Sequence, residues 1–127
     1  MRIALGYCDP DASTPPDWPA IRPLALAYLR AGRIVSQQAA LAPDDWDPTG
    51  VPCVPMGFRT DGAWIWSLAV PYYVDKYGMC IDRGFLNDMR YRGFVPPHVS
   101  LLQLDAAAEV LREVALAAAK LDDPQST

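Results

Sequence analysis

The sequence has few of the residues that carry chemistry in small proteins. It contains one histidine, His98, and three cysteines, Cys8, Cys53 and Cys80, which form no C-x-x-C pair. Paired Cys/His spacings, HExxH, EF-hand loops and glycine-rich phosphate loops are all missing. Because metals and nucleotides are usually held by such donor sets, we expect no metal and no cofactor.

Long hydrophobic runs are also missing. No apolar stretch approaches the roughly 20 residues that cross a membrane, and the N-terminus lacks the basic-then-apolar order of a signal peptide. An odd number of cysteines argues against a disulfide framework and favours buried, reduced thiols. We therefore expect a cytoplasmic protein that does not bind a membrane.

Positive charge is scarcer than negative charge. The chain has 11 Lys and Arg against 15 Asp and Glu, for a net charge of −4. An acidic domain without a basic patch argues against nucleic-acid binding and is compatible with a basic protein partner.

The overall composition is that of a globular domain. Hydrophobic residues make up 51% and charged residues 20% of the 127 residues, which is enough for one core. The prolines mark loops and helix starts and fall mainly in residues 10–23, 43–55 and 96–97. We expect a single α+β domain over residues 1–127, with an irregular segment at 1–22 and a frayed tail at 122–127.

A β-hairpin is the predicted centre of this fold. Asp61-Gly62 separates two apolar, aromatic-rich runs, and Asp-Gly is typical of a two-residue type I′ turn with positive φ. That turn sets four cross-strand pairs: Thr60–Ala63, Arg59–Trp64, Phe58–Ile65 and Gly57–Trp66. One face of the hairpin then carries Met56, Phe58 and Ile65, and the other carries Arg59, Trp64 and Trp66.

We expect an antiparallel sheet of three or four strands, packed with about four helices. Further strands are predicted at residues 2–7 and 33–40. The predicted helices run from Pro23 to Gly32, from Ser67 or Pro71 to Gly78, from an Asp82 cap to Gly93, and from a Ser100/Gln103 capping box to about Lys120.

The loop at residues 42–52 holds Asp44, Asp45, Trp46 and Asp47, an aromatic residue among three carboxylates. One interpretation is a set of Asx turns with Trp46 at the edge of the core. The other is an exposed acidic binding site with a tryptophan anchor, extended by the face of Arg59, Trp64 and Trp66. Packing within the sheet is a sufficient explanation for that second face.

Two other classes of function stay open. A small enzyme or ligand-binding domain could have a pocket between the hairpin and the helices of residues 71–92, lined by Trp66, Tyr73, Tyr77 and His98. Cys53 or Cys80 with His98 would be the minimum for a thiol nucleophile and its base, but no local motif supports that pairing. We assign no catalytic residue. The third class is a structural or regulatory subunit that dimerises through its sheet or last helix.

The run FRTDGAWIWSLAVPYYVDKYG, preceded by AYLRAGRIV, resembles small α+β proteins of high-GC bacteria. Some of these are immunity proteins encoded beside secreted toxins. The resemblance covers roughly residues 24–94 and is most specific from Arg59 to Trp66. It implies a non-catalytic protein that neutralises a toxin, but it identifies no toxin and carries over no binding residue. Acidic immunity proteins can block basic toxins, with charge raising the rate of association.

Overall fold

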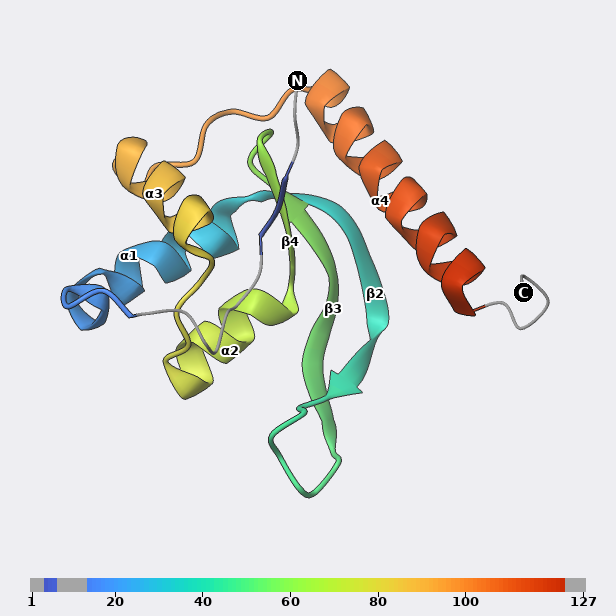
Figure 1. The fold of residues 1–127 in the computed structure, drawn as a ribbon, viewed down its shortest axis with the longest axis horizontal. Coiled ribbons are helices and arrows are strands. Elements are labelled where there is room, and N and C mark those ends of the chain that lie inside the picture. Colours follow the sequence, from blue (N-terminus) through green and yellow to red (C-terminus); the bar gives the residue numbers. More distant parts are fainter. Residues whose placement is uncertain (1–3, 7–13, 123–127) are drawn as a thin grey trace.

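A four-stranded sheet forms the centre of the computed structural model, which describes residues 4–6 and 14–122 (Figure 1). Its order is β1-β4-β3-β2. The strands are β1 (Ala4–Gly6), β2 (Arg33–Pro43), β3 (Pro52–Thr60) and β4 (Trp64–Ser67). The last three are antiparallel neighbours, and β1 pairs with β4 in parallel. The predicted α+β fold with a central hairpin is confirmed.

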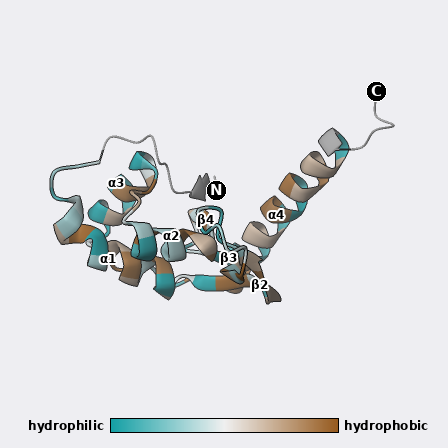
Figure 2. Ribbon diagram, turned by 90° about the horizontal axis from the view of Figure 1, so that it is seen from below, coloured by the Kyte–Doolittle hydropathy of each residue, from teal (hydrophilic) through white to brown (hydrophobic). Residues whose placement is uncertain are grey.

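Helices lie on both sides of this sheet. They are α1 (Trp18–Ala31), α2 (Ala69–Tyr77), α3 (Arg83–Tyr91) and α4 (Leu101–Asp122). The first three gather on one side, whereas α4 contacts β2 and then extends away from the body (Figure 2). The main core therefore lies between the sheet and α1, α2 and α3.

Trp66 is a fully buried tryptophan of that core. Its indole Nε1 donates a hydrogen bond to the Leu29 carbonyl at 3.0 Å, and its ring packs beside Phe85. A Cβ atom on Gly32 would lie 2.4 Å from the Trp66 ring. Gly32 is therefore required by close packing. Gly32 does end the helix as predicted, but not in the left-handed conformation that is common for a glycine after a helix, because its φ of −60° and ψ of 152° are extended.

The first helix begins earlier than predicted. It starts at Trp18 and contains Pro23, which we had expected at its first position. Trp18 is buried, and its indole donates to the Gly78 carbonyl at 2.9 Å. Asp17 makes a bidentate ion pair with Arg90 on α3. These tertiary contacts stabilise an extra turn at the start of α1, which the positions of the prolines alone do not predict.

The other helix boundaries follow local sequence rules. The Asp82 carboxylate accepts from the Phe85 amide at 3.1 Å, and Gly78 ends α2 with a φ of 68°. Ser100 and Gln103 form the predicted reciprocal capping box, with bonds of 3.1 and 2.9 Å. The predicted frayed tail falls almost entirely on residues 123–127, outside those that the structure describes.

The predicted register of the hairpin is wrong by two residues. Thr60 pairs with Ile65, and Arg59 pairs with Trp66. The cause is the side chain of Asp61, whose Oδ1 accepts from the amides of Ala63 and Trp64 at 2.9 and 2.7 Å. These bonds hold two more residues in the turn. A shift of two residues preserves the alternation of a strand, so both predicted faces keep their members.

Gly62 has a φ of 96°, and a Cβ atom there would lie 2.7 Å from the Gln103 amide nitrogen. We expect Gly62→Val to lower the free energy of unfolding by about 2 kcal/mol or more, because a β-branched residue is strained at positive φ. Urea denaturation measures this loss.

Gly50→Val is the matched control. Gly50 also has a positive φ, but a Cβ atom there would meet nothing within 4 Å. Gly50→Val therefore introduces backbone strain without a steric clash, and it should lower the free energy of unfolding by less than Gly62→Val does. Equal losses at the two positions would contradict a role for the contact between Gly62 and α4.

Candidate functional site

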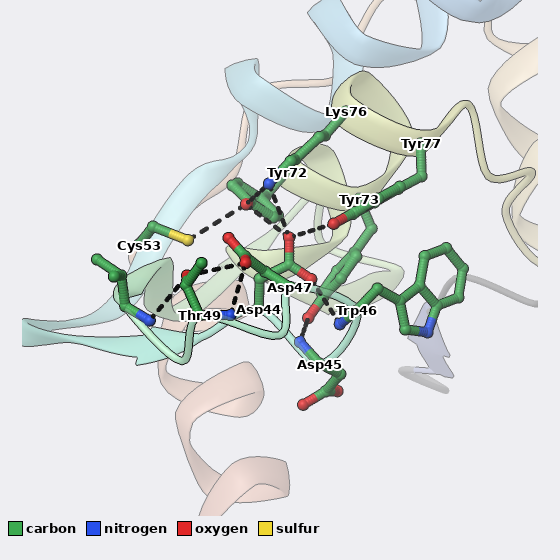
Figure 3. A network of polar contacts seen from close by, with 11 residues as sticks. Asp44, Asp45, Trp46, Asp47, Thr49, Cys53, Tyr72, Tyr73, Lys76 and Tyr77 are labelled. Atoms are coloured by element: carbon green, nitrogen blue, oxygen red, sulfur yellow. Dashed lines mark hydrogen bonds and ion pairs between the residues drawn. The ribbon is translucent and has the colours of Figure 1, made fainter.

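Strands β2 and β3 continue past the end of β4 as a two-stranded ribbon, and residues 44–51 join them (Figure 1). This connecting loop folds against α2 through Asp44, which is only 2% exposed (Figure 3). The Asp44 Oδ2 accepts hydrogen bonds from the hydroxyls of Tyr72 and Tyr77, at 2.8 and 2.7 Å, and from the Lys76 ammonium at 3.1 Å. Asp44 is therefore the hub that fastens the loop to the helix.

The spacing of α2 places these partners together. Tyr72 and Lys76 are four residues apart, as are Tyr73 and Tyr77, so each pair shares a face of the helix. The rings of Tyr73 and Tyr77 stack with centroids 6.0 Å apart, as their spacing predicts. The Tyr73 hydroxyl also accepts from the Asp45 amide at 3.1 Å. Two faces of one short helix thus hold the loop.

The protonation states of Asp44 and Lys76 follow from their contacts. Burial alone would raise the pKa of the Asp44 carboxyl, but hydrogen bonds from Tyr77, the Trp46 amide, Tyr72 and Lys76 outweigh it and hold the pKa below its ordinary value. Bonds to Tyr72 and Asp44 raise the pKa of Lys76. At neutral pH, Asp44 is therefore a carboxylate and Lys76 is an ammonium.

Tyr72 and Cys53 extend the network from α2 to strand β3. The Cys53 Sγ lies 3.3 Å from the Tyr72 hydroxyl. This contact, together with the bond to Asp44, raises the pKa of Tyr72 to about 12. A hydroxyl that keeps its proton so firmly is a poor general base at neutral pH.

Trp46 is the exposed member of the loop. Its side chain is 51% exposed, and its ring lies edge-on to Tyr77 and Tyr73, with centroid distances of 4.7 and 6.1 Å. Its amide donates to the Asp44 Oδ1 at 2.8 Å. A notch of about 200 Å³, lined in part by Asp45 and Met79, opens beside it. The indole is thus held in place while about half of it faces solvent.

The three carboxylates of the loop have different surroundings. Asp44 is the buried hub, and Asp47 forms an Asx turn by accepting from the Thr49 amide and hydroxyl at 2.9 and 2.8 Å. Asp45 is exposed, and its carboxylate has no hydrogen-bond partner in the part of the chain that the structure describes. The Asx-turn interpretation thus describes Asp44 and Asp47, and Asp45 is left to face solvent beside Trp46.

The second predicted binding face, formed by Arg59, Trp64 and Trp66, is only partly accessible, because Trp66 is buried and the other two residues are half-buried. Trp66 is in the core, and Trp64 stacks on Phe85 with centroids 4.9 Å apart. Arg59 lies opposite Trp66 rather than Trp64. The packing of α1 and α3 against this face explains the correction, because the shift in register leaves both faces with the same members.

The four residues predicted for the alternative pocket do not line a common pocket, although a cleft with other lining residues does lie between β3 and α2. The space between the hairpin and α3 is filled by the Trp64–Phe85 stack, and Tyr73 and Tyr77 face Trp46 instead of Trp66. His98 is exposed in the link between α3 and α4, and the Cys53 Sγ contacts the Tyr72 hydroxyl. Cys80 is buried, and Cys8 lies outside the described residues.

Sequence reasoning missed two features of this region. One is the contact of Asp44 with α2, for which the only local signal is the four-residue spacing of Tyr72 and Lys76. The other is the lining of the cleft of about 360 Å³ between β3 and α2, which lies in the region predicted for the alternative pocket but contains none of the four residues predicted to line it. Among the described residues, no three His, Cys, Asp or Glu side chains gather closely enough to hold a metal ion.

Comparison with known proteins adds no relative. No family model, no curated protein and no solved structure matches the chain. Within residues 4–6 and 14–122, none of the helices combines the length and the apolar character needed to cross a membrane.

Proposed function

We propose that this protein is a specific, non-catalytic protein-binding domain that contacts its partner through Trp46. The observation that carries the proposal is the half-exposed indole, fixed by Asp44 below it and by two tyrosine rings beside it. Binding energy at protein interfaces concentrates in a few large aromatic and arginine side chains. A tryptophan held in advance loses little conformational entropy on binding.

The partner that fits this surface is basic. Asp45 lies at the rim of the notch between Trp46 and Tyr73, and its carboxylate faces solvent. An arginine or lysine side chain in the notch would lie over aromatic rings and beside a carboxylate, two favourable surroundings for a cation. The net charge of −4 would also raise the rate of encounter with a basic protein.

In its most specific form, the proposal is an immunity protein that neutralises a bacterial toxin in the cytoplasm. The resemblance of the run from Arg59 to Trp66 to such proteins supports this form. The Trp46 notch supports it as well, because a basic toxin would offer arginine and lysine side chains. The product of a neighbouring gene is the first partner to test.

Trp46→Ala tests the proposal once a partner has been purified. We expect affinity to fall by about 30-fold, equivalent to about 2 kcal/mol, mostly through faster dissociation. Asp45→Asn should instead slow association and weaken its dependence on salt, because rim charges act on encounter. Surface plasmon resonance at two salt concentrations separates the two effects.

Tyr91→Ala is the matched control, because Tyr91 on α3 is an aromatic side chain that is 93% exposed. Its loss should leave affinity unchanged. Melting temperatures of all variants show whether the fold is intact. If Trp46→Ala destabilises the fold but leaves the affinity of the folded protein unchanged, the interface lies elsewhere on the molecule.

A further inference from the structure

A cleft lies between the end of α1, strand β3 and α2, next to the face of α2 that binds Asp44. Its volume of about 360 Å³ is in the range of small-molecule sites. Three cations, Arg30, Arg59 and Lys76, line it together with one carboxylate, Asp75. This concentration of positive charge stands out in a protein whose net charge is −4.

Two of these cations already have carboxylate partners. Arg30 forms an ion pair with Asp75 at 3.1 Å, and both side chains are more than half exposed. Lys76 is bonded to Asp44 and to the Tyr72 hydroxyl. Their positive charges are therefore largely compensated within the protein.

Arg59 differs from them. One of its N–H groups donates to the Gly32 carbonyl at 2.7 Å, at the C-terminal end of α1. In the described part of the chain, no carboxylate lies within 4 Å of its guanidinium. An arginine has five donors in a planar fork that matches a carboxylate. Arg59 is thus half-buried, anchored on one side and able to receive an anion on the other.

The rest of the cleft wall is largely apolar, with Leu68, Pro71 and Pro55 beside the polar groups. We propose that this cleft binds a small organic monocarboxylate, with its carboxylate on Arg59 and its apolar body against Leu68 and Pro71. A single uncompensated cation matches a single negative charge, whereas a phosphate dianion would need a second one. The site goes beyond the protein-binding function, because it uses a different surface from the Trp46 notch.

Benzoate is the probe, and benzamide is its uncharged control of the same shape. We expect benzoate to bind with a Kd of about 1 mM and to shift the backbone amide signals of residues around the cleft, including Gln37 and Leu68. Benzamide should bind at least about 10-fold more weakly, because it cannot form the charged pair with Arg59. NMR titration of the wild-type protein measures both.

Arg59→Gln should weaken benzoate binding by about 10-fold or more, and Arg59→Lys by less, because lysine keeps the charge but not the fork. Arg112→Gln on α4 removes the same charge outside the cleft and should change the Kd less than about twofold. The wild-type comparison of benzoate with benzamide stands even if Arg59→Gln fails to fold.

Three results would overturn the site: equal binding of benzoate and benzamide, amide shifts confined to other surfaces, or the same loss of affinity in Arg112→Gln as in Arg59→Gln. None of these bears on the affinity change expected for Trp46→Ala. The two proposals are therefore tested independently.

Discussion

Asp61→Ala is expected to lower the free energy of unfolding by about 3–5 kcal/mol, because it leaves several buried donors without an acceptor. Asp61 is only 1% exposed. Its Oδ2 accepts from the Tyr28 hydroxyl at 2.5 Å, and its Oδ1 accepts from the amides of Ala63 and Trp64. The carboxylate thus joins α1 to the turn of the hairpin. Urea denaturation followed by circular dichroism measures the loss.

Two milder variants separate the parts of this effect. Tyr28→Phe removes one donor and should cost about 1–2 kcal/mol. Asp61→Asn keeps an oxygen for the two turn amides and places an NH2 group near the Tyr28 hydroxyl, which can turn to accept from it. It should therefore cost less than the alanine variant. If Asp61→Ala costs no more than Tyr28→Phe, the turn does not depend on the carboxylate.

Asp44→Ala is expected to lower the melting temperature by on the order of 10 °C at neutral pH. The change takes an acceptor from the hydroxyls of Tyr72 and Tyr77 and from the ammonium of Lys76. It also removes the bond to the Trp46 amide. We expect partner affinity to fall as well, although Asp44 is buried, because the indole loses the support that fixes it. Asp47→Ala breaks a local turn only and is the matched control.

The Asp44 effect should depend on pH in a defined direction. The pKa of Asp44 is lower in the folded protein than the value of about 3.9 that is usual for an unfolded chain. The unfolded chain therefore takes up the proton first as pH falls, and the stabilisation is complete above about pH 5 and declines below about pH 4. The gap in melting temperature between wild type and Asp44→Asn should narrow over this acid range. A constant gap would contradict a pKa of Asp44 that is lower in the folded protein than in the unfolded chain.

Features set by neighbouring residues could be predicted from the sequence. The capping box of Ser100 and Gln103, the Asp82 cap and the glycine that ends α2 all depend on groups within a few positions of one another. The two faces of the hairpin followed from the period of two along a strand, which a two-residue error in register leaves intact. Interactions between residues close in the sequence thus determine where most helices and strands begin or end, and which side chains share a face.

Features set by distant residues could not be predicted in this way. Asp44 and Asp61 both lie in turns, where aspartate is common for local reasons, yet each is buried because its partners come from helices 28–33 positions away. Trp46 and Trp66 likewise look alike in the sequence. The sequence by itself determined the elements and their apolar faces, because these depend on local bonds and periodicity. Only the tertiary structure decided which carboxylates became hubs and which tryptophan reached solvent, because packing between distant elements determines burial.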